Sequence, residues 1–216
     1  IVVILNSHTV NTYFSSNTEC SKLTINTGGI IEMNNSVYTL RPSFSGECII
    51  NNGTLRNGFL YPSSSATISG SGTYSNVGLI KASTRITIDS DVTFDKKIEL
   101  YSNCILKINP GKTLTINGEI KIVGGGVENE GIIEIGNIGS FFTGSNQSAN
   151  NLETDLGTLK IPSSITIPQV INNEIGSLII SSGANAIINS NFDIGNLQIE
   201  STATLQVNSD FSVSGN

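Results

Sequence analysis

The alternation of apolar and polar residues is most regular near the C-terminal end of the chain, where it repeats. Similar tetrapeptides begin at positions 156, 175 and 194 (Leu-Gly-Thr-Leu, Ile-Gly-Ser-Leu and Ile-Gly-Asn-Leu), so 19 residues separate each from the next. The same step places Ile180 on Ile199 and Asn189 on Asn208. A fixed period of about 20 residues indicates one structural unit stacked on the next. We therefore expect regular 19-residue repeats over 156–213. The two asparagines are candidates for an amide ladder, and the alternative is that Asn recurs there because a turn favours it.

Short alternating runs also fill the earlier part of the chain. Segments such as 23–25, 86–88 and 105–108 alternate apolar residues with Thr or Lys, and turns rich in Asn, Gly and Ser separate them. This is the pattern of strands with one buried and one solvated face. Antiparallel hairpins would fit the short spacing, but the 19-residue repeat favours parallel stacking. The sequence thus predicts an all-β fold, a right-handed single-stranded parallel β-helix (β-solenoid) with about 19–22 residues per coil.

We expect residues 1–216 to form one solenoid with two interruptions. Residues 41–65 contain Pro, Ser and Phe in no regular order and predict irregular loops, and the Asn- and Ser-rich segment 137–155 predicts a polar insertion. The sequence at 49–55 is echoed at 127–135, which predicts that one type of turn recurs several coils later. The last residues begin a further repeat, so we expect the chain to be a fragment of a longer polypeptide.

Composition supports strands and excludes some partners. Charged residues make up 13% of the chain, against roughly 25% in ordinary globular domains, and helix-forming residues are scarce. The net charge of −6 and the lack of Lys or Arg runs argue against a nucleic-acid-binding surface. No apolar run approaches the roughly 18 residues of a membrane span.

The three cysteines, Cys20, Cys48 and Cys104, are too few and too scattered for a disulfide framework or a zinc site. Each lies beside an apolar strand, so we expect buried small side chains. A disulfide between Cys20 and Cys48, in neighbouring coils, is the alternative.

Several segments resemble the repeats of large secreted cell-surface proteins of Bacteroidota. The segments are Val-Ile-Leu-Asn-Ser-His-Thr-Val at 3–10, the run at 20–31 and Ile-Ile-Asn-Asn-Gly-Thr-Leu at 49–55, together with Gly-Ser-Leu and Gly-Asn-Leu at 176–178 and 195–197. The chain has Asn-Ser before His8, where the family pattern usually has Gly. The resemblance covers most of the chain except 56–84 and 137–155. It implies an exported, surface-attached β-helix protein, often delivered by type IX secretion and in some cases linked to adhesion or gliding.

Candidate chemistry is sparse. His8 is the only histidine and lies in a segment whose pattern is structural, so we assign it no catalytic role. Asp89, Asp91 and Asp95 are a weak candidate for Ca²⁺, because carboxylate oxygens are its preferred ligands, but solvated turn acids are the expected role. The acids at 128, 130 and 134 are expected to face solvent.

Aromatic side chains in the irregular region are the candidates for a shallow glycan-binding patch, with packing as the alternative. They are Tyr38, Phe59, Tyr61 and Tyr74.

The sequence therefore predicts a non-enzymatic structural or adhesive segment, a stalk or rod of a large bacterial cell-surface protein. We expect an extracellular location and no cofactor apart from the Ca²⁺ candidate. The expected partners are the rest of the polypeptide and either surface glycans or other cell-surface proteins. The alternative is a glycan-binding or polysaccharide-degrading parallel β-helix protein.

Overall fold

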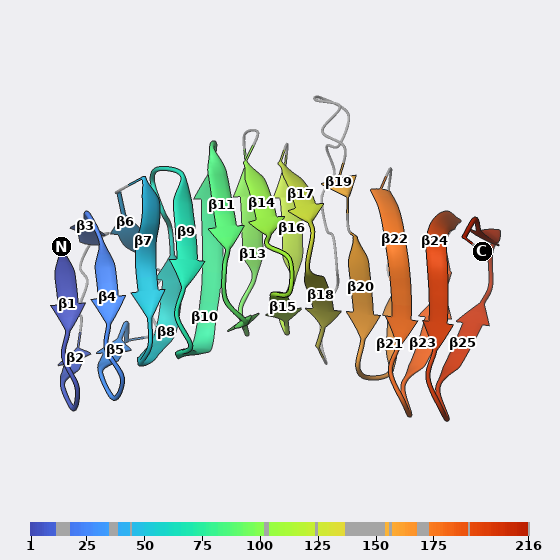
Figure 1. Ribbon diagram of the computed structural model, residues 1–216, viewed down its shortest axis with the longest axis horizontal. Coiled ribbons are helices and arrows are strands. Elements are labelled where there is room, and N and C mark those ends of the chain that lie inside the picture. The colour runs from blue at the N-terminus through green and yellow to red at the C-terminus, as the bar shows by residue number, and fades with distance from the viewer. Residues whose placement is uncertain are drawn as a thin grey trace.

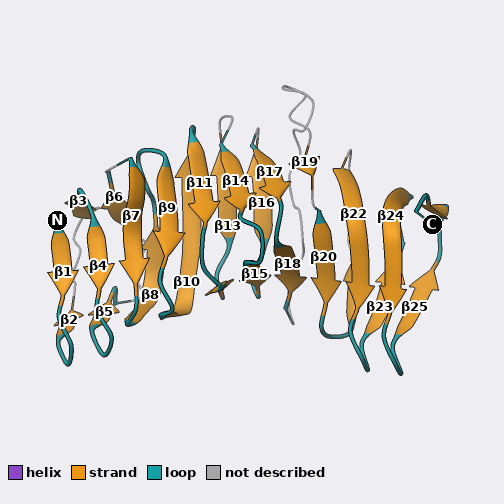
Figure 2. Cartoon of the chain, viewed as in Figure 1, coloured by secondary structure: helices purple, strands orange, loops and turns teal. Residues whose placement is uncertain are grey.

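The computed structural model describes residues 1–11, 18–34, 39–43, 45–101, 104–123, 125–136, 154–155, 157–167, 173–189 and 191–215. Within these ranges the regular secondary structure is all strand, and each strand pair is parallel. The strands follow one another along the long axis of the molecule, and the two ends of the chain lie at opposite ends of that axis (Figure 1). Strands and loops alternate along its whole length (Figure 2). The predicted parallel β-solenoid is confirmed.

Three sheets run along the rod. The first sheet has two rows of strands that merge near the C-terminal end. Its first row contains β1 (Val2–Ile4), β4 (Leu23–Ile25), β7 (Gly46–Asn51), β9 (Ala66–Ser69), β11 (Arg85–Ile88), β14 (Ile105–Ile108), β17 (Gly126–Asn129) and β19 (Thr154–Asp155). Its second row contains β12 (Val92–Phe94), β15 (Thr113–Ile116), β18 (Ile132–Ile135) and β20 (Thr158–Ile161). The rows meet in β22 (Asn173–Ile180), which is followed by β24 (Phe192–Ile199) and β26 (Phe211–Val213).

The second and third sheets form the remaining sides. The second sheet contains β2 (Thr9–Asn11), β3 (Thr18–Cys20), β5 (Ile30–Glu32), β6 (Thr39–Pro42), β8 (Thr54–Leu60), β10 (Thr73–Ala82), β13 (Ile98–Tyr101) and β16 (Ile120–Val123). The third sheet contains β21 (Ile165–Ile167), β23 (Asn185–Ile188) and β25 (Thr204–Val207).

Columns of aliphatic side chains fill the interior. Ile88 pairs with Ile68 on one side and with Ile108 on the other, and all three are fully buried. Because side chains alternate across a strand, this register places every second residue in the core and leaves its neighbours outside. Each aliphatic side chain buried in this way contributes about 1.5–3 kcal/mol relative to an exposed one. The alternating pattern of the sequence is therefore the main source of stability.

The predicted repeat is confirmed in the hydrogen-bonded register. Ile194 pairs with Ile175 and with Val213, a step of 19 residues each time. Elsewhere the step widens where a turn is longer, as between Val92 and Leu114, which are 22 residues apart. The amide ladder is also present, since Asn208 Nδ2 donates to the side-chain oxygen of Asn189 at 2.7 Å.

The prediction of irregular loops over 41–65 is wrong for most of that segment. Strands β6, β7 and β8 occupy 39–42, 46–51 and 54–60. The alternation fails because β8 turns a corner at Asn57, whose φ is +61°, and its buried positions change phase there. The chain bends at this corner, but its backbone remains paired with the neighbouring strands of the sheet. Of the predicted insertion at 137–155, residues 137–153 lie outside the described residues, and 154–155 form β19.

One type of buried turn recurs, as the similar sequences at 49–55 and 127–135 predict. Asn51 accepts a hydrogen bond from the Gly53 N–H at 3.1 Å and donates one to the carbonyl of Thr73, in the next coil, at 3.0 Å. Asn129 accepts from the Gly131 N–H at 3.0 Å and donates to a carbonyl of the next coil at the same distance. Both asparagine side chains are buried, so each satisfies polar backbone that the turn would otherwise leave unpaired.

Candidate functional site

The aspartates considered for Ca²⁺ take part in hydrogen bonds between coils. Asp89 Oδ1 accepts from the Asn109 side chain, and Asp91 Oδ1 accepts from the Thr113 N–H, both at 2.8 Å. Asp95 lies beyond β12, at the next corner of the coil. In the described part of the chain, no three His, Cys, Asp or Glu side chains form a group that could hold a metal ion. The structure therefore does not bring these three carboxylates together as a ligand set.

Asp95 belongs to a chain of polar side chains that runs along one corner of the rod, and we call it the corner ladder. It consists of Glu32, Asn57, Asn76, Asp95 and Asn117, one from each of five successive coils. Asn57 Nδ2 donates to Glu32 at 2.8 Å, and Asn76 Nδ2 donates to the Asn57 side chain at 2.8 Å. Asp95 accepts from the Asn76 N–H at 2.9 Å and from Asn117 Nδ2 at 2.7 Å. The ladder thus connects five coils through hydrogen bonds of these side chains and of the Asn76 backbone N–H.

Glu32 anchors the N-terminal end of the ladder. Burial raises its pKa, but hydrogen bonds from Asn57, from the Asn34 N–H and from Arg56 outweigh that effect, so the pKa of Glu32 is lowered overall. The Arg56 Nε lies 2.7 Å from the carboxylate. The charged form of Glu32 is therefore held in place at neutral pH.

The aromatic candidates separate into core and surface residues. Tyr74 is only 4% exposed, and its ring centroid lies 5.6 Å from that of Phe94 inside the core. Its burial raises the pKa of the phenol well above the usual range. Tyr74 therefore belongs to the core, and its inclusion in a surface patch is wrong. Tyr38 lies outside the described residues. Phe59 and Tyr61 are half-buried and alternate with the buried Leu60, so both face outward.

Phe59 lies across a glycine of the next coil. Phe59 and Gly78 are register partners, and a Cβ at Gly78 would lie 2.4 Å from the Phe59 ring. Only glycine leaves room for the ring there, an arrangement in which an aromatic side chain covers the bare backbone. Lys96 Nζ lies 5.1 Å from the centroid of this ring, within cation–π range, and burial lowers the pKa of Lys96.

A second cation and ring pair lies beside the first. Arg41 Cζ lies 4.7 Å from the centroid of the Tyr61 ring. Leu60 and Leu79 are register partners, and Tyr61 and Ile80 are the residues that follow them. Ile80 pairs with Glu99, and Glu99 pairs with Lys121. One column of neighbouring positions therefore runs through Arg41, Tyr61, Ile80, Glu99 and Lys121, in which Glu99 is buried. We call this surface the outer patch, and it comprises Arg41, Phe59, Tyr61, Ile80, Lys96 and Lys121.

Sequence reasoning found the two outward rings but missed the rest of the patch. The 19-residue step connects position 59 with 78, 61 with 80 and 80 with 99, so counting by the repeat would have placed Ile80 beside Tyr61. Lys96 and Arg41 carry no such signal, because their places over the rings depend on side-chain packing.

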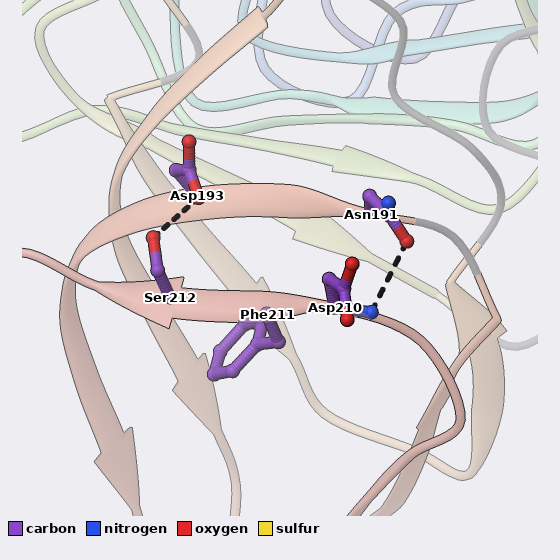
Figure 3. Close-up of a pocket in the computed structure, with 5 residues that line it drawn as sticks. All are labelled: Asn191, Asp193, Asp210, Phe211 and Ser212. Atoms are coloured by element: carbon purple, nitrogen blue, oxygen red, sulfur yellow. Dashed lines mark hydrogen bonds between the residues drawn. The ribbon is translucent and has the colours of Figure 1, made fainter.

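A separate open depression lies near the C-terminal end of the rod, on β24 and β26 (Figure 3). Two hydrogen bonds cross it between coils: Ser212 Oγ donates to Asp193, and the Asp210 N–H donates to the Asn191 side chain at 3.1 Å. Phe211 forms its apolar side. These contacts connect one coil to the next, as the corner ladder does.

The other predicted residues also occupy structural positions. His8 is exposed, and its Nδ1 donates to the Asn6 carbonyl at 2.8 Å. Glu128 forms a two-bond ion pair with Arg85, two coils away, at 2.5 and 3.1 Å. Glu130 and Glu134 pair with lysines of neighbouring strands, each at 2.9 Å. These acids therefore bind cations of their own chain.

All three cysteines are buried, and no disulfide joins them. The Cys20–Cys48 disulfide that the sequence left open is therefore not formed in this structure. Burial raises the pKa of the Cys20 thiol.

Comparisons with protein-family models, with curated proteins and with solved structures find no match to this chain. Among the described residues no helix has the length and apolar character needed to cross a membrane. The class that the fold defines is the parallel β-solenoid, a repeat protein whose coils each contact mainly their neighbours.

Proposed function

We propose that this chain is a length of rigid rod in a large bacterial cell-surface protein, with a structural and adhesive role rather than an enzymatic one. The observation that carries the proposal is that polar side chains at the turns form hydrogen bonds between successive coils. Hydrogen bonds connect the five residues of the corner ladder from coil to coil, three between side chains and one from the Asn76 backbone N–H to Asp95. Such an arrangement stiffens a solenoid along its axis, because adjacent coils cannot separate without breaking these bonds.

The resemblance to secreted Bacteroidota surface proteins supports an extracellular setting for this rod. The segments that carry the resemblance, at 20–31 and 49–55, contribute strands β4, β5 and β7 and the buried turn at Asn51. They are thus coil-forming sequences, in keeping with a repeated surface scaffold. Delivery by type IX secretion is part of the proposal.

Deleting one whole coil from the full-length protein in its native cells tests the rod. Removal of 175–193 takes out one 19-residue step and joins Glu174 to Ile194, which keeps the phase of the ladder. We expect the shortened protein to remain displayed and cells to keep adhering, with the rod about 4.8 Å shorter. The control deletion, 175–184, breaks the phase and should unfold the adjacent coils.

Two results would contradict the proposal. The first is surface labelling of intact cells that finds the protein only inside them. The second is loss of adhesion on deletion of 175–193 although circular dichroism shows an intact fold. The enzymatic alternative is tested with the purified chain on a panel of soluble polysaccharides, where new reducing ends or unsaturated products would replace the adhesive role with a degrading one.

A further inference from the structure

Asparagine is followed directly by glycine at three places in the chain, at 52–53, 57–58 and 117–118. Close stacking of the coils requires each glycine. A Cβ at Gly118 would lie 2.6 Å from the Lys96 carbonyl oxygen, and one at Gly53 or Gly58 would come at least as close to an atom of another coil. Because glycine has no side chain, it also leaves its peptide nitrogen open to the asparagine before it. The packing of the rod therefore creates three places where asparagine can react with its own backbone.

The reaction in question is deamidation, which needs only water as co-reactant. The glycine nitrogen bonds to the side-chain carbonyl carbon of asparagine and loses its proton, and the side-chain nitrogen leaves as ammonia. Water then opens the resulting cyclic imide at either carbonyl, which gives aspartate or isoaspartate. The glycine N–H must be free to approach, and the carboxamide must be free to turn towards it.

At 52–53 both reacting groups are engaged elsewhere. The Gly53 N–H donates to the side-chain oxygen of Asn51 at 3.1 Å. The side-chain oxygen of Asn52 accepts from the Ser71 N–H at 3.1 Å. Attack at this place requires both hydrogen bonds to break.

At 57–58 the reacting groups lie inside strand β8. Asn57 is held at both ends of its carboxamide, since Nδ2 donates to Glu32 and the oxygen accepts from Asn76, each at 2.8 Å. Gly58 packs against Met33, whose Cβ would lie 2.6 Å from a Cβ added there. Attack at this place requires the strand to open.

The third place differs, because Asn117 and Gly118 lie in the turn between β15 and β16, outside the strands. Among the described residues, the Gly118 N–H makes no hydrogen bond, so the nucleophile is available. The carboxamide of Asn117 is held by one exposed hydrogen bond, from Nδ2 to Asp95 Oδ1 at 2.7 Å. Its oxygen lies beside Gly136 and accepts no hydrogen bond in the described part of the chain.

We propose that Asn117 is a site of self-modification, at which attack by the Gly118 nitrogen converts the side-chain amide to aspartate and isoaspartate. In the aspartate product, a carboxylate oxygen replaces the Nδ2 that donates to Asp95. Two carboxylates then face each other where a hydrogen bond joined two coils, and like charges at such a distance repel. The corner ladder thus loses its last link as the protein ages. This inference goes beyond the proposed function, since it concerns the lifetime of the rod.

Incubation of the purified, folded chain in mildly alkaline heavy-oxygen water, followed by peptide mapping with mass spectrometry, tests the site. Each event incorporates one heavy oxygen, which distinguishes new reaction from aspartate already present. We expect Asn117 to react at least about tenfold faster than Asn52 and Asn57, because those two must wait for local opening. The matched control is the same chain unfolded in urea, where the three rates should become similar.

Two variants test the consequence for the ladder. Asn117→Ala and Asn117→Asp both remove the hydrogen bond to Asp95, but only the second adds a charge. The backbone N–H of residue 117 donates to the Phe94 carbonyl at 2.9 Å, so its hydrogen exchange reports on the separation of these coils. We expect exchange about twofold faster in Asn117→Asp than in Asn117→Ala at low ionic strength, and added salt should reduce the difference. Circular dichroism confirms that both variants fold.

Four results would overturn the inference. One is a rate at Asn52 or Asn57 that equals or exceeds the rate at Asn117 in the folded chain. Another is an absence of heavy oxygen at Asn117 after the unfolded chain has reacted. An unchanged order of rates in urea would show that local sequence, and not the fold, selects the site. Equal hydrogen exchange in the two variants would exclude repulsion from Asp95 as the consequence.

Discussion

The buried turn at Asn51 offers a direct test of how the coils are held together. The Asn51 side chain is fully buried and makes two hydrogen bonds, one to the Gly53 N–H and one to the Thr73 carbonyl. The matched residue is Asn208, which also makes two side-chain hydrogen bonds, to Asn189 and from Gln206, but is exposed. The substitutions Asn51→Ala and Asn208→Ala therefore remove the same side chain and the same number of bonds.

The expected magnitudes differ because water can replace only one set of bonds. Asn51→Ala leaves the half-buried Gly53 N–H without a partner and creates a small void, while the exposed Thr73 residue gives water access to its carbonyl. A buried polar group left unpaired costs about 1–3 kcal/mol, so we expect a loss of about 2 kcal/mol. Asn208→Ala should change the free energy of unfolding by no more than about 0.5 kcal/mol.

Urea denaturation followed by far-ultraviolet circular dichroism measures this difference, since the chain contains no tryptophan. With a slope of about 2 kcal/mol per molar urea, the Asn51→Ala midpoint should fall by about 1 M. Native-state hydrogen exchange adds the location, because coils contact mainly their neighbours and the faster exchange should be confined to 46–82. Equal losses of unfolding free energy in the two variants would refute the reasoning, because burial would then not determine how much these hydrogen bonds stabilise the fold.

Two further predictions concern backbone and ionisation. Gly70 and Gly183 both have positive φ, at +96° and +78°, but a Cβ at Gly70 would lie 2.2 Å from the Asn51 carbonyl oxygen, while one at Gly183 would meet no atom within 4 Å. Thermal denaturation should therefore show a loss of about 1–2 kcal/mol for Gly183→Ala and more than about 3 kcal/mol for Gly70→Ala, and a reversed order would contradict the geometry. Burial raises the pKa of Tyr74, so its neutral form stabilises the fold fully below about pH 10 and that contribution is lost as pH rises above this value. In absorbance titration Tyr74 should ionise only as the chain unfolds, Tyr74→Phe should flatten the alkaline loss of stability, and early ionisation of all five tyrosines would exclude its burial.

The repeat made much of the fold predictable. Because apolar residues return after 19 positions, the partners of Ile175, Leu178 and Ile180 in the next coil follow from counting, and the structure pairs them as expected. The amide pair of Asn189 and Asn208 follows in the same way. A parallel stack with constant register thus converts sequence spacing directly into spatial neighbours.

The failed prediction of loops over 41–65 has its physical origin in a corner of the coil. Asn57 adopts a left-handed conformation inside β8, which changes the side on which the following residues point. In the sequence, such a change of phase interrupts the alternation and therefore resembles a loop. Tyr74 lies before the equivalent bend at Asn76 and is the register partner of Leu55, a core position, so it enters the core.

The candidate site was only partly predictable for a different reason. Outward rings at 59 and 61 are visible from alternation, but the cations that cover them come from positions 41 and 96. The Phe59 ring lies against the bare backbone of Gly78, and the two cations reach the rings through long, flexible side chains. Sequence spacing carries no information about such packing.

The constant 19-residue register has a consequence for how such a protein changes over generations. Since Ile175, Ile194 and Val213 occupy equivalent positions, unequal recombination within this region adds or removes whole multiples of 19 codons without altering the reading frame. Each event lengthens or shortens the rod by one strand spacing and leaves every buried column in phase. The reach of the rod is therefore set by the number of copied units, and a lineage can adjust it in single steps while the surface carried on other coils stays unchanged.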